Sequence, residues 1–200
     1  MNKHETLNMN HETQGNLLLS PHFRLSEFEA SRTAAEQGIA NVAPPEAVEN
    51  LRRLCEGCLE PLREALGRPI VITSGYRCQR LNEILVHAAR KSQHMQGCAA
   101  DFYVGQAQVS GFRFQVSGDL KLETGDSPVK LETPRQRLIE AFKTILQDSS
   151  IDYDQVILYP NFIHVSYVSK ERNRHGILKA LSNGKLGYGR LTLENALKVV

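Results

Sequence analysis

Apolar residues recur with helical spacing in one long stretch of the chain. The pattern opens at Pro44-Pro45, follows i, i+3, i+4 and i+7 steps, and ends at Gly67. Pro61 falls inside it and predicts a bend, because a proline removes one helical hydrogen bond. We expect the apolar stripe to lie in the core; its members are Leu51, Leu54, Cys55, Cys58, Leu59, Leu62 and Leu66.

Shorter patterns predict further helices. Ser26 with Glu29 three residues later is a capping-box signature for a short helix, and a second one is expected from Ser31 to Gln37, where Gly38 ends it. Three more are predicted: one after Arg77 that carries Leu81, Ile84, Leu85 and Ala88, one that starts at Thr133-Pro134-x-Gln136, and a short terminal one within 191–200.

Strand patterns complete the predicted fold. Residues 70–72 form a short apolar run, and 154–159 and 162–168 flank a turn at Pro160-Asn161. In the last run, Ile163 and Val165 would face the core and His164 the opposite side. The pattern predicts an α+β fold, in which helices pack on a small, mainly antiparallel sheet.

Length and charge limit the class of protein. The 200 residues are 41% hydrophobic, enough for one domain with extensions, and the net charge of +2 argues against a dedicated nucleic-acid binder. No apolar run approaches the roughly 18 residues of a membrane span. The first residues lack the basic-then-apolar order of a secretory signal, so we expect a protein that is cytoplasmic as synthesised. We expect a monomer.

The cysteines include a Cys-x-x-Cys pair, which invites a redox or zinc interpretation. Cys55 and Cys58 both fall on the apolar stripe, however, and no second pair follows. Cys78 and Cys98 are isolated in the sequence. We interpret all four as unpaired thiols in a reducing compartment, the pair being buried.

Two histidines and an aspartate form a plausible zinc set. His94 and Asp101 lie seven residues apart around Gly97, where a tight turn would bring both side chains onto one ion. His164, on the opposite face of a predicted strand, would supply the third ligand. Three protein ligands leave a fourth position for water, as in hydrolytic zinc sites. The alternative is that these are ordinary half-buried histidines with hydrogen-bond partners.

The motif Ser92-x-His94-x-x-Gly97-x-Ala99-x-Asp101, preceded by Thr73-Ser74-Gly75-Tyr76-Arg77 and followed by Phe162-Ile163-His164-Val165, resembles the zinc D-Ala-D-Ala carboxypeptidases and related peptidoglycan peptidases. These share a fold with the hedgehog signalling domain, and the resemblance spans about Ser20 to Arg174. It implies that His94, Asp101 and His164 bind Zn²⁺. Arg77 would bind or polarise the substrate, Ser92 would support the metal loop or the bound peptide, and the substrate would be a peptidoglycan stem peptide.

One position departs from the family. Asn161 stands three residues before the last histidine, where family members usually place a catalytic Asp or Glu, and an amide is no general base. Either Asp152 or Asp154 reaches the site, activity is weak, the turn is offset by a residue or two, or the protein is a catalytically silent zinc-containing cell-wall-binding module. A purely structural zinc is a further alternative.

Local composition and the resemblance together divide the chain. We expect a disordered N-terminal lead at 1–16, a zinc peptidase-like domain at 17–174 and a C-terminal extension at 175–200. Short sequence echoes mark 105–133 as an inserted loop or hairpin. His4 and His11 in the lead fit a solvated tail better than a metal tract. Since peptidoglycan lies outside the cell, we expect action at the cell wall after lysis, as for phage endolysins, or after export without a signal.

Overall fold

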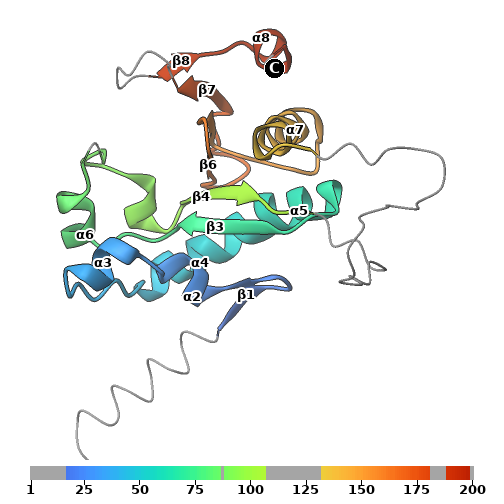
Figure 1. The fold of residues 1–200 in the computed structure, drawn as a ribbon. Helices are drawn as coiled ribbons and strands as arrows, with labels where there is room; N and C mark the ends of the chain where they lie inside the picture. Colours follow the sequence, from blue (N-terminus) through green and yellow to red (C-terminus); the bar gives the residue numbers. More distant parts are fainter. Residues whose placement is uncertain (1–16, 87, 107–131, 181–187, 199–200) are drawn as a thin grey trace, which may run out of the picture.

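The structure is a computed structural model that describes residues 17–86, 88–106, 132–180 and 188–198 (Figure 1). Most of the predicted insertion, the lead with His4 and His11, and His87 therefore lie outside the described residues. No helix in the described ranges is long and apolar enough to cross a membrane.

A six-stranded sheet forms the centre of the fold. Its strands, in spatial order, are β3 (Ile70–Ser74), β4 (Ala99–Val104), β6 (Ile163–Ser166), β5 (Gln155–Leu158), β7 (Gly176–Ala180) and β8 (Tyr188–Arg190). All neighbours are antiparallel except β5 and β7. A separate hairpin pairs β1 (Leu18–Ser20) with β2 (Phe23–Arg24). The predicted α+β class with a mainly antiparallel sheet is confirmed.

Seven α-helices and two irregular helical turns accompany this sheet in the described residues. They are α2 (Leu25–Glu29), α3 (Arg32–Glu36), α4 (Pro45–Leu54), α5 (Glu60–Leu66), α6 (Gln79–Ile84), α7 (Pro134–Gln147) and α8 (Leu193–Leu197), with a π-helical turn η1 (Cys55–Leu59) and a 3-10 helix η2 (Gln93–Gln96). Phe102 of β4 and Val165 of β6 share one core cluster with Leu51 of α4 and Phe142 of α7. Because side chains alternate along a strand, Asp101 and His164 point to the other face.

The predicted bend at Pro61 is a π-helical turn that joins α4 to α5. A proline at this position cannot donate a hydrogen bond to the carbonyl of Gly57. That carbonyl accepts the backbone N–H of Asp152 at 3.0 Å instead. A side chain at Gly57 would also meet the Tyr167 ring, only 2.7 Å from an ideal Cβ. The irregular turn thus fits the helix against the segments that follow α7 and β6.

The predicted helix starts are partly confirmed. Thr133 caps α7, with its Oγ1 accepting the N–H of Gln136 at 3.2 Å. The capping box expected at Ser26 and Glu29 is wrong, since α2 starts at Leu25. Glu27 accepts the N–H of Arg24 there at 2.7 Å, and Glu29 accepts that of Ala43. A second acidic residue, Glu27, follows Ser26 directly and made the sequence pattern ambiguous.

The helix after Arg77 is shorter than its pattern suggests. It ends at Ile84, so that the predicted members Leu85 and Ala88 lie beyond it.

Cys55, Cys58 and Cys98 are buried as free thiols, and Cys78 is half-buried and also free. Burial raises the pKa of the Cys55 and Cys58 thiols far above its ordinary value. The interpretation of the Cys-x-x-Cys pair as core is confirmed.

The segment that follows Arg174 is joined to the same sheet. Its β7 pairs in parallel with β5, with Val156 opposite Ile177, and β8 pairs with β7. Ala196 of α8 is fully buried and belongs to the core cluster. Residues 176–180 and 188–197 thus extend the sheet and its helical cover, while the domain boundaries drawn from the sequence remain a prediction.

Candidate metal centre

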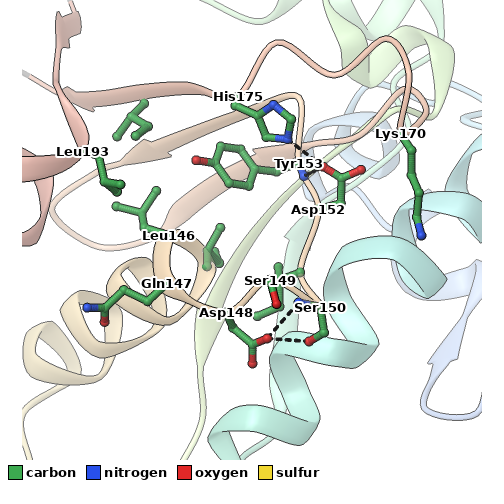
Figure 2. Close-up of a pocket in the computed structure, with 13 residues that line it drawn as sticks. Leu146, Gln147, Asp148, Ser149, Ser150, Asp152, Tyr153, Lys170, His175 and Leu193 are labelled. Atoms are coloured by element: carbon green, nitrogen blue, oxygen red, sulfur yellow. Dashed lines mark hydrogen bonds and ion pairs between the residues drawn. The ribbon is translucent and has the colours of Figure 1, made fainter.

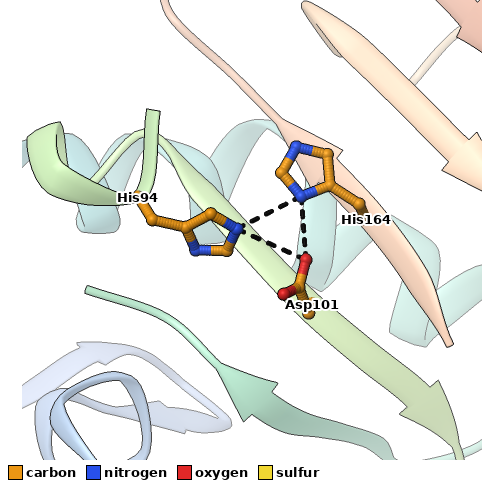
Figure 3. A group of neighbouring side chains, drawn as sticks. All are labelled: His94, Asp101 and His164. Atoms are coloured by element: carbon orange, nitrogen blue, oxygen red, sulfur yellow. Dashed lines mark hydrogen bonds and ion pairs between the residues drawn. The ribbon is translucent and has the colours of Figure 1, made fainter. Parts of the chain in front are cut away.

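Three separate segments bring His94, Asp101 and His164 together (Figure 3). Asp101 lies on β4 and His164 directly opposite it on β6, in register across the ladder. His94 comes from η2, the short helix that leads into β4. The structure therefore assembles the three residues that the sequence predicted as ligands.

Their donor atoms converge on one point. Oδ1 of Asp101 lies 2.8 Å from Nδ1 of His164 and 3.3 Å from Nε2 of His94. The two ring nitrogens are 3.2 Å apart. Zinc bonds of about 2.0–2.1 Å set tetrahedral donors about 3.3 Å apart, so these spacings fit one face of a zinc tetrahedron.

A backbone carbonyl fixes the orientation of the His94 ring. Nδ1 of His94 lies 2.7 Å from the carbonyl oxygen of Gly75, which can only accept a hydrogen bond. The proton must therefore sit on Nδ1, and Nε2 presents its lone pair to the centre. This pairing of one ring nitrogen with a fixed acceptor is typical of metal-binding histidines.

Burial and charge keep the donors in the states that a metal requires. His94 is 3% exposed, and this burial lowers the pKa of its imidazole, which favours the neutral ring. Burial alone would raise the pKa of Asp101, but its contacts within the group, among them the hydrogen bond with Nδ1 of His164, hold the pKa well below its usual range. The carboxylate is therefore ionised and the His94 ring neutral.

The η2 turn that carries His94 depends on a glycine. Gly97 ends it with a φ of +71°, a left-handed conformation that side chains disfavour. An ideal Cβ on Gly97 would also lie 2.3 Å from the carbonyl oxygen of Ala47 in α4. The glycine thus lets the turn pass close against the helix below it, which explains why the motif needs this residue.

The donor set suits zinc on chemical grounds. Two imidazole nitrogens and a carboxylate oxygen match the nitrogen and oxygen ligands of catalytic zinc sites, which keep a fourth position for water or substrate. Among the described residues, no further His, Cys, Asp or Glu joins this group. The residues present therefore fit a three-ligand metal site better than a closed structural one.

Comparison with known families agrees with the geometry. A family model described as Peptidase M15 matches residues 21–118. Over this segment the chain is similar to the Peptidase M15 family. The match supports the zinc D-Ala-D-Ala carboxypeptidase-like family that the sequence motifs resemble, and it contains His94 and Asp101. His164 lies beyond the matched residues and is brought to them by strand pairing.

Two other comparisons add no relatives to the M15 match. No curated protein matches the chain, and no solved structure matches it either.

Arg77 lies where the M15 segment turns from β3 into α6, and it contacts a proposed metal ligand. Its Nη2 is 2.8 Å from Oδ2 of Asp101, and its Nε and Nη2 both reach the hydroxyl of Ser74 at 2.9–3.0 Å. The predicted contact with substrate remains a prediction. Ser92 is nearly buried and stands at the N-terminal end of η2, next to the metal loop that it was predicted to support.

Asn161 lies in the turn between β5 and β6. The turn is closed by the N–H of Tyr159, which donates to the carbonyl of Phe162 at 3.0 Å, and Asn161 is exposed at its tip. It lines a cavity of about 320 Å³ together with Tyr103 and Arg135. None of the three donor residues lines this cavity.

Asp152, one alternative carboxylate, faces another part of the molecule (Figure 2). Its Oδ1 lies 2.9 Å from Nε2 of His175, whose ring packs edge-on against Tyr153. All three line a cavity of about 680 Å³ at the end of α7. None of the metal-binding candidates lines this cavity.

Asp154, the other alternative, is 1% exposed and fully engaged. Arg174 binds both of its oxygens, and Gln93 donates to Oδ2 at 2.9 Å. Burial alone would raise its pKa, but the contacts with Arg174 and Gln93 lower it to about 2. A carboxylate held in this way is a poor proton acceptor at neutral pH.

Sequence reasoning missed the partners that orient the ligands. The carbonyl of Gly75 leaves no mark in a sequence, because every residue has one. Ser74 and Gly75 do belong to the quoted Thr73 to Arg77 motif, which is the one signal that could have indicated a role near the metal. Gln93 gave no signal of its own.

Proposed function

We propose that this protein is a zinc-dependent peptidase that hydrolyses peptide bonds in peptidoglycan stem peptides, on a fold of the hedgehog/DD-peptidase type. The observation that carries the proposal is the convergence of His94 Nε2, Asp101 Oδ1 and His164 Nδ1 at 2.8–3.3 Å. The M15 match supports the reaction class, and the substrate follows from the family resemblance. The cell wall is accordingly the proposed site of action.

Several groups of the protein would have separate roles at this centre. When bound there, zinc would supply a Lewis acid that polarises a peptide carbonyl and lowers the pKa of water to about 7. The carbonyl of Gly75 holds the His94 ring in the tautomer whose Nε2 lone pair is free to bind the metal. Arg77 holds the carboxylate of Asp101. The Arg77 contacts use its Nε and Nη2, and we propose that Nη1, with its two further N–H groups, orients the substrate.

The position of Asn161 favours one rival function. An exposed amide stands where the family places its catalytic carboxylate, and both Asp152 and Asp154 are paired elsewhere. Loss of a positioned proton acceptor typically costs about 10²–10⁴-fold in rate. A catalytically silent zinc-containing module that binds the cell wall is therefore the second candidate, with the same metal site and no turnover.

Mass spectrometry of purified stem peptides and cross-linked muropeptides separates the two candidates. We expect zinc-loaded protein to release D-Ala or to cut cross-links, which also distinguishes a carboxypeptidase from an endopeptidase. The product should disappear in a chelated sample and in His94→Ala. The matched control His22→Ala, a half-exposed histidine paired with Glu60, should keep activity. Unchanged peptides that remain bound to zinc-loaded protein would instead support the silent module.

A further inference from the structure

Asp154 is a buried charge that joins three parts of the chain. It lies just before β5 and is 1% exposed. Oδ1 accepts from the backbone N–H and from Nε of Arg174 at 2.9 and 2.8 Å, while Oδ2 accepts from Nη2 of Arg174 at 2.5 Å and from Gln93 at 2.9 Å. The hydroxyl of Ser166 lies 3.5 Å from Oδ2. A carboxylate is removed from water at such cost only when it is paired in this way.

Two of these contacts lead directly to proposed zinc ligands. Gln93 immediately precedes His94 on η2, and Ser166 follows His164 by two residues on β6. The backbone N–H of Asp154 also donates to the carbonyl of Ser166 at 2.7 Å. One side chain therefore links the loop that carries His94 to the strand that carries His164.

The His94 loop needs such a link. The η2 helix is four residues long, so its own hydrogen bonds hold it weakly. The contacts of His94 with Gly75 and Arg77 fix the loop to the end of β3 and the turn after it, on the side of β4 away from β6. Gln93 fixes it in the opposite direction, toward β5 and β6.

We propose that Asp154 is a positioning residue for the metal centre, acting through the amide of Gln93. It sets the separation of His94 and His164 before a metal binds, so that zinc binding does not have to order the loop. Outer partners of metal ligands typically change metal affinity by about 10–100-fold. This inference rests on the proposed zinc site, but it requires no catalytic turnover.

The test removes only the amide. Gln93→Met keeps the length of the side chain, loses the donor to Asp154 and leaves the Arg174 pair in place. Gln93→Ala is the second variant, for the case in which methionine does not fit. Gln79→Ala is the matched control, since it removes the same amide from an exposed pair with Glu83 on α6. Zinc affinity is measured by competition with a chromogenic chelator, and amide hydrogen exchange is measured on the metal-free protein.

We expect zinc affinity to fall about 10–100-fold in Gln93→Met and to stay within about twofold of wild type in Gln79→Ala. In metal-free Gln93→Met, the amides of Met95 and Gly97 should exchange faster than in wild type. Wild-type affinity and exchange in both Gln93 variants would overturn the role of Asp154. Absence of zinc binding in the wild-type protein would instead overturn the proposed function.

Discussion

Nη2 of Arg77 lies 2.8 Å from Oδ2 of Asp101, while the other oxygen of that carboxylate faces the two histidines. The pair is nearly buried, with side-chain exposures of 15% and 12%. Asp101 therefore presents Oδ1 to the metal position and Oδ2 to a fixed cation. Arg77 acts on a proposed ligand in the absence of any substrate.

Arg77→Ala should weaken zinc binding by about 10-fold or more, because Asp101 loses the partner that orients it. Arg77→Lys should bind zinc with an affinity between those of wild type and Arg77→Ala. A lysine ammonium lacks the planar fork with which the guanidinium contacts both Ser74 and Asp101. Chelator competition gives the affinities, and Arg80→Ala, an exposed arginine on α6, is the control. Unchanged zinc affinity in Arg77→Ala, with loss of peptide binding, would assign Arg77 to the substrate alone.

Gly97→Ala should destabilise the protein more than Gly38→Ala does. Both glycines have positive φ, of +71° and +60°, but a Cβ on Gly38 would meet nothing within 4 Å, whereas one on Gly97 would meet Ala47. We expect about 1–2 kcal/mol for the backbone cost alone in Gly38→Ala. Overpacking should add about 1–3 kcal/mol in Gly97→Ala. Urea unfolding measures the loss of unfolding free energy in both variants. Equal losses would show that α4 moves away from the new methyl group without cost.

The ion pair of Asp154 predicts a dependence of stability on pH. Its pKa is lowered from 3.8 to about 2 in the folded protein. The lowered pKa contributes stability that is complete above about pH 4 and is lost as the pH falls toward 2. The contribution is at most about 2 kcal/mol, since the Arg174 side chain is 64% exposed and water screens part of the pair.

Asp154→Asn isolates this contribution. The difference in unfolding free energy between wild type and variant, both free of metal, should shrink as the pH falls from 4 to 2. Chemical unfolding in chelator at each pH measures it, and comparison of the two proteins cancels the titration of Asp101. A difference that stays constant over this range would mean that Asp154 titrates normally in the folded state.

Asn161→Asp tests whether the family position is catalytic in this protein. The β4 and β6 register places Phe102 opposite Ile163, so the turn tip with Asn161 lies beyond the pair of Asp101 and His164. A separation of about three strand residues is about 10 Å. We therefore expect zinc affinity to be unchanged and the rate of stem-peptide cleavage to stay within about threefold of wild type. A gain above 10-fold would show that the turn bends over the metal and that the carboxylate was lost in this chain.

The zinc candidates could be predicted because their signal is local in the sequence. His94, Gly97 and Asp101 lie within eight residues, and strand alternation alone put His164 on the face away from Ile163. The helical stripe to Gly67 was equally readable, since apolar periodicity reports the buried face directly. These features depend on residue type and spacing, which a sequence contains.

The supporting contacts could not be predicted, because they join distant residues through ordinary groups. Gln93 meets Asp154 across 61 positions, and both residue types are common on surfaces. The π-helical turn before Pro61 depends on the backbone N–H of Asp152. This N–H donates to the carbonyl of Gly57, which the proline cannot hydrogen-bond. Such pairings follow from tertiary packing, and the spacing of apolar residues in the sequence does not predict them.

Diffraction from crystals of the zinc-loaded protein, with anomalous data at the zinc edge, tests the central claim most directly. We predict one peak bonded at about 2.0–2.1 Å to Nε2 of His94, Nδ1 of His164 and Oδ1 of Asp101. The peak should be absent in His164→Ala crystals. Zinc bound elsewhere, at the Cys55 and Cys58 pair or at His175, with the three donors left in mutual hydrogen bonds, would contradict the account.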